Sequence, residues 1–136
     1  MSENNIVDEW LRYAQNDLTV AKHCFNDLNP KQTEIASYHC QQCAEKAVKA
    51  FLIFKDTEPP KTHDIKLLCK MCQDIDNTFS GISNLCAHLT PYGVTIRYPD
   101  ELAPDEDMVK TAIQNAQQVY DFCISKINSQ EAKNRE

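Results

Sequence analysis

The sequence predicts an all-α fold, an up-and-down helical bundle of four to five helices. Apolar residues recur every three or four positions through long stretches of the chain, as they do along one side of an α-helix. Only 2 glycines occur, and the 6 prolines lie between the periodic stretches. The 136 residues suffice for one hydrophobic core and are too few for two ordinary domains.

The first two predicted elements are long helices. Apolar residues repeat at helical spacing over residues 6–28, which predicts the first helix. The second helix is expected to begin near Pro30 with Asn29 as its cap, and to end before residues 56–60, because a residue that precedes a proline avoids the helical region. The apolar positions of the two helices are Val7, Trp10, Leu11, Ala14, Leu18, Ala21, Phe25 and Leu28, and then Ala36, Cys40, Cys43, Ala44, Ala47, Val48, Phe51 and Leu52. We expect Trp10, Phe25 and Phe51 in the core, with no functional role.

Two shorter helices are predicted in the middle of the chain. The first is capped by Thr62 or Asp64, and the second extends from Phe79 to Leu89. Their apolar sides consist of Ile65, Leu68, Cys72 and Ile75, and of Ile82, Leu85, Cys86 and Leu89.

The last part of the chain combines a loop with a final long helix. Residues 91–105 break the helical pattern, so we expect a loop there, with a short extended piece. Pro104 and the acids at 105–107 suit the start of a helix. Residues 1–128 are therefore expected to form one bundle, and residues 129–136 a frayed tail.

The composition of the chain excludes some partners. The formal net charge of -6 argues against a surface for duplex nucleic acid, because that affinity comes mainly from cations placed on phosphates. Six lysines nevertheless lie between residues 46 and 70, so a small anion stays a candidate ligand. The sequence has no apolar run of about 18 residues and no basic region followed by an apolar stretch at its start, so we expect a cytoplasmic protein with no membrane partner.

Two C-x-x-C pairs, Cys40 with Cys43 and Cys69 with Cys72, have the spacing of half zinc sites. Such zinc ligands normally lie on tight turns, whereas both pairs fall within predicted helices, where free cysteine behaves as a small apolar residue. The odd total of seven cysteines favours reduced thiols. We expect packing residues, with no metal and no cofactor; metal or redox chemistry is the alternative.

Three stretches carry a resemblance to a known family. Residues 8–25 resemble its opening helix, residues 38–54 followed by 59–68 resemble its Gln-x-Ala-Glu-Lys helix and Thr-His segment, and residues 96–101 resemble the Arg-Tyr-Pro that precedes its closing helix. The chain is therefore similar to the HEPN domain family (higher eukaryotes and prokaryotes nucleotide-binding), in particular to its small stand-alone prokaryotic members. The resemblance extends over residues 7–127.

The resemblance implies a helical bundle that is commonly a homodimer. Many members are encoded beside, or fused to, a minimal nucleotidyltransferase, and such pairs often act as toxin and antitoxin. Other members are metal-independent endoribonucleases with an Arg-x4-6-His motif. Neither Arg12 nor Arg97 has a histidine at that offset, since the first histidine after Arg12 is His23. We therefore expect no catalytic residues and no enzymatic activity, and no modification of a tyrosine belonging to the longer form of the motif.

Six residues are candidates for a nucleotide or phosphate site. Lys46 and Lys49 could meet phosphate oxygens as compact cations, although Lys49 could instead be the outer half of a solvated pair with Glu45 at i,i+4. The other candidates are Thr62, His63, Arg97 and Tyr98.

These other four candidates also have structural alternatives. Thr62 and His63 lie at a predicted helix start, where an anion is favoured, but Thr62 could cap that helix and His63 could pack against a neighbour. Arg97 could hold phosphate bidentately or pair with an acid such as Asp64. Tyr98 could stack on a base or be buried between helices.

The function favoured by these observations is a non-catalytic module that dimerises and binds a nucleotide, a nucleotidyltransferase, or both. One alternative is an endoribonuclease with a degenerate or displaced site, in which His39, His63 or His88 serves as the acid-base group. The other alternative is a purely structural helical dimer. The sequence does not identify the nucleotide, nor the helix face that dimerises.

Overall fold

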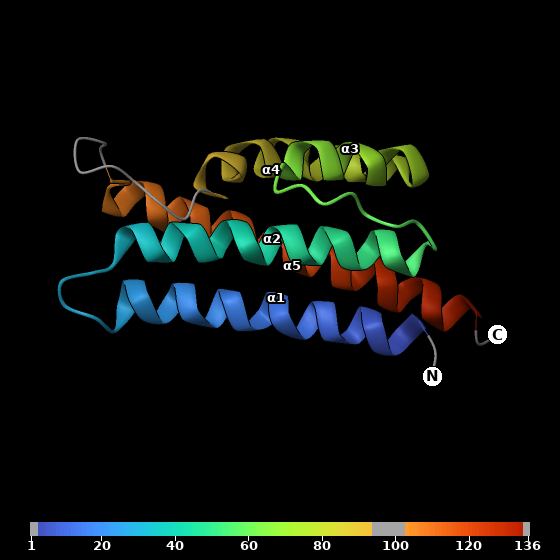
Figure 1. The fold of residues 1–136 in the computed structure, drawn as a ribbon, viewed down its shortest axis with the longest axis horizontal. Coiled ribbons are helices and arrows are strands. Elements are labelled where there is room, and N and C mark those ends of the chain that lie inside the picture. Colours follow the sequence, from blue (N-terminus) through green and yellow to red (C-terminus); the bar gives the residue numbers. More distant parts are fainter. Residues whose placement is uncertain (1–2, 94–102, 135–136) are drawn as a thin grey trace.

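The computed structural model describes the backbone of residues 3–93 and 103–134, and side chains from Asn5 onward (Figure 1). All regular structure in these ranges is helical, which confirms the predicted all-α bundle. None of the helices in these ranges is long and apolar enough to cross a membrane. The α-helices are α1 (Glu3–Asn26), α2 (Thr33–Phe54), α3 (Ile65–Ile75), α4 (Ser83–Leu89) and α5 (Glu106–Asn134), with 3-10 helices η1 (Asn77–Ile82) and η2 (Thr90–Gly93).

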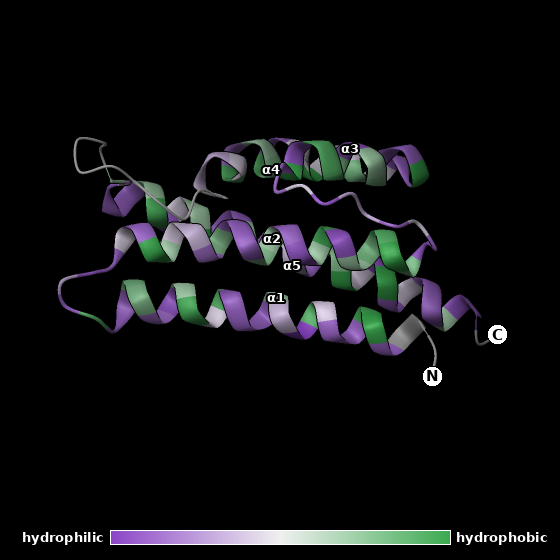
Figure 2. Ribbon diagram, viewed as in Figure 1, coloured by the Kyte–Doolittle hydropathy of each residue, from purple (hydrophilic) through white to green (hydrophobic). Residues whose placement is uncertain are grey.

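Helix α2 is the central element of the bundle. It packs against α1, α3, α4 and α5. Figure 1 shows α1 antiparallel to α2, and α3 and α4 on the opposite side of α2 from α1. Because the α3 and α4 segment brings the chain back to the starting end of α2, α5 runs in the same direction as α2. Figure 2 shows apolar and polar residues alternating along these helices, as the apolar periodicity predicts.

The start of α2 differs from the prediction. The helix begins at Thr33 rather than near Pro30, and Gln32, not Asn29, is its N-cap, with no side-chain cap hydrogen bond. The Gln32 backbone N–H donates to the Cys24 carbonyl at 3.0 Å. This hydrogen bond holds the loop between α1 and α2 against the end of α1. The chain therefore reverses its direction over residues 27–32, and α2 begins only after this turn.

The structure distinguishes between the two predicted caps of α3. Asp64 is the cap, because its carboxylate accepts from the Leu67 N–H at 3.3 Å. The Thr62 hydroxyl instead accepts from the Asp64 N–H at 3.1 Å, within the turn before the helix. The predicted helix from Phe79 to Leu89 is two elements, with Phe79 in η1 and only Ser83–Leu89 in α4.

At the start of α5 the Asp105 carboxylate accepts from the Met108 N–H at 2.8 Å, as the predicted acidic helix start requires. The helix continues to Asn134, beyond the frayed end that we expected after residue 128. The extended piece expected in the loop of residues 91–105 lies outside the described residues, whereas Pro91 belongs to η2.

Of the three aromatic residues predicted to lie in the core, one is completely buried. Phe51 is completely buried and its ring centroid lies 4.4 Å from that of Phe79. Trp10 and Phe25 are only partly buried. Ile75, predicted on the inner side of its helix, is 43% exposed because α3 ends there and its last turn lies at the edge of the core.

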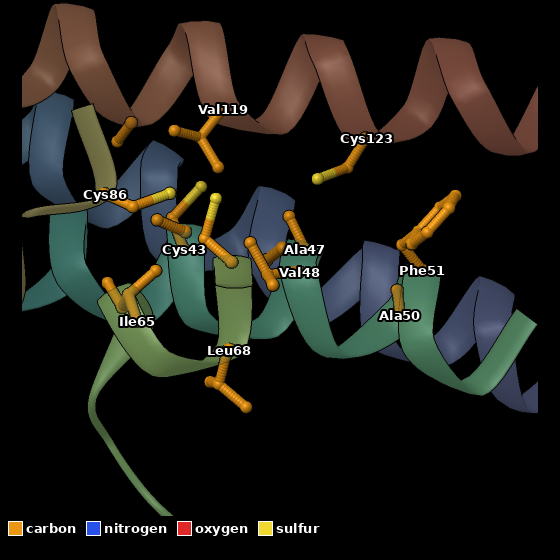
Figure 3. Close-up of a cluster of buried hydrophobic side chains, with 14 of the residues drawn as sticks. Cys43, Ala47, Val48, Ala50, Phe51, Ile65, Leu68, Cys86, Val119 and Cys123 are labelled. Atoms are coloured by element: carbon orange, nitrogen blue, oxygen red, sulfur yellow. The ribbon is translucent and has the colours of Figure 1, made fainter. Parts of the chain in front are cut away.

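All seven cysteines are free and buried. Figure 3 shows Cys43, Cys86 and Cys123 among apolar side chains such as Val48 and Val119. Burial raises the pKa of the Cys40 thiol to about 12, so this side chain is a neutral thiol. In the described ranges, no three His, Cys, Asp or Glu side chains are placed to hold a metal ion. The cysteines thus occupy the positions of packing residues.

Two adjacent leucines of α3 provide a matched test of the core. Leu68 is fully buried, whereas Leu67 is 47% exposed. Leu68→Ala is expected to lower the free energy of unfolding by about 2 to 5 kcal/mol, because it leaves a cavity. Leu67→Ala should change it by less than about 0.5 kcal/mol. Urea unfolding followed by circular dichroism measures both values, and equal effects would contradict this packing of α3.

Candidate functional site

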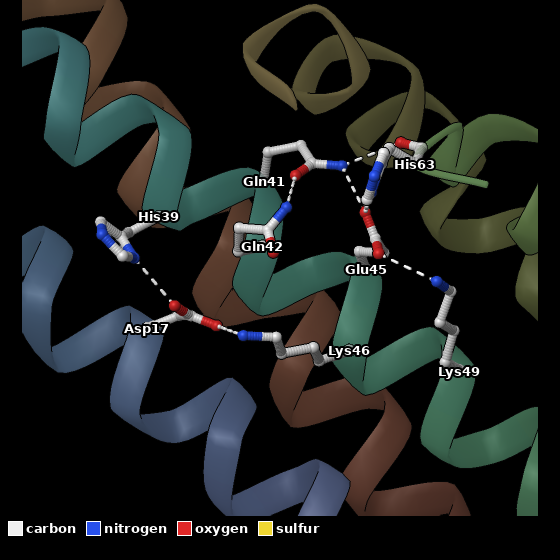
Figure 4. Close-up of polar contacts among 8 residues, drawn as sticks. All are labelled: Asp17, His39, Gln41, Gln42, Glu45, Lys46, Lys49 and His63. Atoms are coloured by element: carbon white, nitrogen blue, oxygen red, sulfur yellow. Dashed lines mark hydrogen bonds and ion pairs between the residues drawn. The ribbon is translucent and has the colours of Figure 1, made fainter. Parts of the chain in front are cut away.

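Polar side chains of α2 form two networks with neighbouring elements (Figure 4). In the first network, the Asp17 carboxylate of α1 accepts from the Lys46 ammonium at 2.6 Å and lies 2.8 Å from Nδ1 of His39. Asp17 is only 7% exposed. Its two oxygens therefore join the middle of α1 to two positions of α2 that lie about two helical turns apart.

The second network surrounds Glu45, which lies between His39 and Lys46 along α2. Its Oε1 accepts from the Gln41 amide and lies 3.0 Å from Nδ1 of His63, and its Oε2 accepts from the Lys49 ammonium at 3.0 Å. The Gln41 amide also donates to the His63 backbone carbonyl at 2.9 Å. Glu45 thus joins α2 to the segment that leads into α3.

The second network keeps the buried Glu45 ionised. Burial by itself would raise the pKa of this carboxyl. Hydrogen bonds with Gln41, Lys49 and His63 together lower the pKa by more than burial raises it, so the pKa lies below the usual value for a glutamate. Lys49 is also buried and pairs with Glu45, so the pair that was one of its two alternatives exists but is not solvated.

A pocket of about 570 Å³ lies beside the second network. Its walls come from the first turns of α1, the last turns of α2 and the segment that follows α2. Lys49 belongs to both the network and the pocket lining, and its ammonium lies 6.0 Å from the centroid of the Trp10 ring. The lining consists of Ile6, Trp10, Lys49, Ile53, Asp56, Thr57, Glu58, Pro59, Pro60 and Lys61.

Two smaller pockets lie elsewhere on the bundle. One, of about 340 Å³, shares Ile6 and Trp10 with the first pocket and extends it along α1 toward Tyr13 and Lys46. The other, of about 390 Å³, lies between η2 and the start of α5, where His88 and Asn115 contribute to its lining. The largest of these three pockets is thus the one that adjoins the buried Glu45 and Lys49 pair.

The structure brings only some of the predicted site residues together. Lys49 and His63 meet through Glu45, whereas Lys46 belongs to the Asp17 network. The Thr62 hydroxyl is used in the turn before α3. Arg97 and Tyr98, the two remaining candidates, lie outside the described residues. The charges of Lys46 and Lys49 are already compensated by carboxylates, which weakens the case for either lysine as a primary phosphate ligand.

Sequence reasoning missed four residues of this region. Trp10 was expected in the core, but its ring lines the pocket. Asp17 and Gln41 were not proposed as site residues, although both are buried polar residues that form the networks. The sequence did contain a signal for both residues, because each is a polar residue next to the apolar positions of its helix. A buried polar side chain without a partner would be costly, so such a residue is expected to have a polar partner. Lys61, at the pocket, had only been counted among the basic residues.

Comparison with known proteins gives one family. The model of the HEPN domain matches residues 7–128, and no curated protein matches. Among solved structures, ST0689, described as an archaeal HEPN homologue, has 26% identity and a TM-score of 0.70, with 89% of this chain and 97% of that chain covered. TT1696 from Thermus thermophilus has 23% identity and a TM-score of 0.75, over 88% and 97% of the two chains, and shares the fold.

The Glu45 network predicts a specific loss of stability. Glu45→Gln leaves the Lys49 ammonium buried without its counter-charge and should lower the free energy of unfolding by about 2 to 4 kcal/mol at pH 7. Because the pKa of Glu45 is lowered in the folded state, its stabilisation is present at neutral pH and is lost as the pH falls through the folded pKa. The difference between wild type and variant should therefore shrink as the pH falls below the usual pKa of a glutamate.

Urea unfolding at neutral and at acidic pH measures this difference. Glu9→Gln is the matched control, since Glu9 forms an exposed pair with Arg12 at 3.5 Å. Such a pair contributes no more than about 1 kcal/mol. Equal losses in the two variants at neutral pH would show that the Glu45 pair is not a buried charge pair.

Proposed function

Since the chain belongs to the HEPN domain family, we propose that it is a non-catalytic module that binds a nucleotide and a partner protein. The proposed partner is a minimal nucleotidyltransferase, of the kind that accompanies many members, in a toxin–antitoxin-like pair. The module is proposed to act as a homodimer in the cytoplasm.

The observation that carries the nucleotide part is the pocket beside Trp10 and Lys49. Its volume of about 570 Å³ falls within the roughly 300 to 1,000 Å³ typical of small-molecule sites. The surface of its lining is mainly apolar, although half of the lining residues are polar or charged, and such a mixture suits a small-molecule site. Lys49 comes from the helix that carries the family resemblance, so the pocket adjoins the signature residues rather than a remote surface.

The absence of a catalytic role is part of the proposal. No arginine in the sequence is followed by a histidine with four to six residues between them. Three of the histidines, His23, His39 and His63, each lie beside a carboxylate of this chain. A carboxylate neighbour orients an imidazole for structural reasons as readily as for acid-base chemistry. The missing Arg-x4-6-His spacing is therefore what favours binding over RNA cleavage.

Calorimetric titration with ATP, GTP and a dinucleotide tests the nucleotide part. We expect dissociation constants in roughly the micromolar range, which a few polar contacts supply after ordering costs. Arg97→Ala should weaken binding severalfold, because Arg97 is a proposed phosphate ligand. Arg12→Ala, which removes an exposed cation of α1, should leave affinity unchanged. Unchanged affinity in Arg97→Ala would exclude Arg97 from the site, and no heat with any ligand would refute nucleotide binding.

Co-expression tests the partner part. A reading frame next to the gene that encodes a Gly-Ser-x-Ala-Arg-Gly type nucleotidyltransferase should yield a protein that co-elutes with this chain in size-exclusion chromatography. Light scattering of this chain alone should give twice its mass of 15.6 kDa if it is a homodimer. Separate elution of the two proteins at tens of micromolar would refute the partnership.

A further inference from the structure

We propose that the pocket beside Trp10 binds a nucleotide through its base. It prefers a nucleotide of low charge, such as a nucleoside monophosphate, over a nucleoside triphosphate. This inference rests on the proposed nucleotide binding and adds the ligand class and the role of each wall. Three features of the lining carry it: an aromatic ring, a buried ammonium with unused donors, and the balance of charge at the edge.

The aromatic feature is Trp10. Its side chain is partly buried against the core and lines the pocket, where Ile6, Ile53 and the two successive prolines 59 and 60 supply further apolar surface. Any of the nucleic-acid bases can stack on an indole ring, because every base has a π-face. The apolar walls exclude water from such a stack but offer little to a phosphate chain.

The second feature is the Lys49 ammonium. Lys49 is 8% exposed and lines the pocket. An ammonium has three N–H donors, and within the described ranges the Lys49 ammonium donates to Glu45 alone. Two donors are therefore left at the pocket, near the Trp10 ring. A ring nitrogen or carbonyl oxygen of a stacked base can accept from them, and this needs no net negative charge because Glu45 already balances the lysine.

The third feature is the charge at the edge. The remaining charged side chains of the lining are Asp56, Glu58 and Lys61, and none of the three forms an ion pair with a residue that the structure describes. Two acids thus face one cation. One phosphate can be placed next to Lys61, but each further phosphate adds repulsion from Asp56 and Glu58. The lining therefore favours a monophosphate, or the end of an oligonucleotide, over a triphosphate.

Fluorescence of Trp10 tests the inference directly, because it is the only tryptophan of the chain. Titration with AMP, ATP and adenosine should quench this fluorescence, and AMP should bind at least as tightly as ATP. Trp10→Leu should weaken AMP binding about tenfold in calorimetry, since stacking is lost. Trp10→Phe keeps an aromatic ring and should stay within about threefold of wild type, which separates loss of stacking from loss of folding.

The charge balance has its own variant. Asp56→Asn with Glu58→Gln should strengthen ATP binding severalfold and leave adenosine unchanged. Asn suits position 56, whose backbone φ of 57° is in the left-handed region that Asn tolerates. Asp74→Asn on α3, which removes an exposed acid paired with Lys70, is the matched control and should leave ATP affinity unchanged.

The outcomes separate this inference from the proposed function. Nucleotide binding by calorimetry, with Trp10 fluorescence and the Trp10→Leu affinity unchanged, would overturn the inference and leave nucleotide binding intact at another site. ATP binding much tighter than AMP would also overturn it. No binding of any nucleotide would refute both.

Discussion

The arrangement around the pocket depends on one buried carboxylate. Glu45 lies in the middle of the central helix, and its two oxygens are used by Gln41, Lys49 and His63. A charge at this depth is stable only because these groups replace the water that it loses. The same contacts hold Lys49 against the pocket and hold the segment before α3 against α2. One ion therefore positions both Lys49 in the pocket lining and the segment that leads into α3.

Periodicity and punctuation were sufficient to predict most of the fold. The helical stripes of α1, α2 and α5 are long, so their apolar faces are unambiguous. The boundaries were harder to predict, because α2 starts only after the chain has been tied to Cys24, and that contact is not visible in the local sequence. The segment of η1 and α4 has helical spacing throughout, and sequence alone did not distinguish its 3-10 turn from an α-helix.

The site could be predicted only in part. Lys49 and His63 were identified as candidates, but their connection through Glu45 requires the segment before α3 to fold back on α2. Trp10 was assigned to the core because its spacing matches that of the other apolar residues of α1. In the structure, α1 has two adjacent apolar stripes, and Trp10 lies on the outer one with Ile6, which is 51% exposed. The spacing of apolar residues identifies the apolar face of a helix, but it does not show which residues of that face remain exposed at the border.

The position of α5 beside α2 has a consequence for synthesis of the chain. The surface of α2 that α5 covers is completed only by residues 106–134, which are synthesised after α1, α2, α3 and α4. Helices α1 and α2 are adjacent in sequence and can pair early, since short loops close at little entropic cost. Until α5 is made, the surface of α2 that α5 covers in the folded protein has no partner. The nascent protein therefore passes through an incomplete bundle whose exposed core is a binding surface for chaperones.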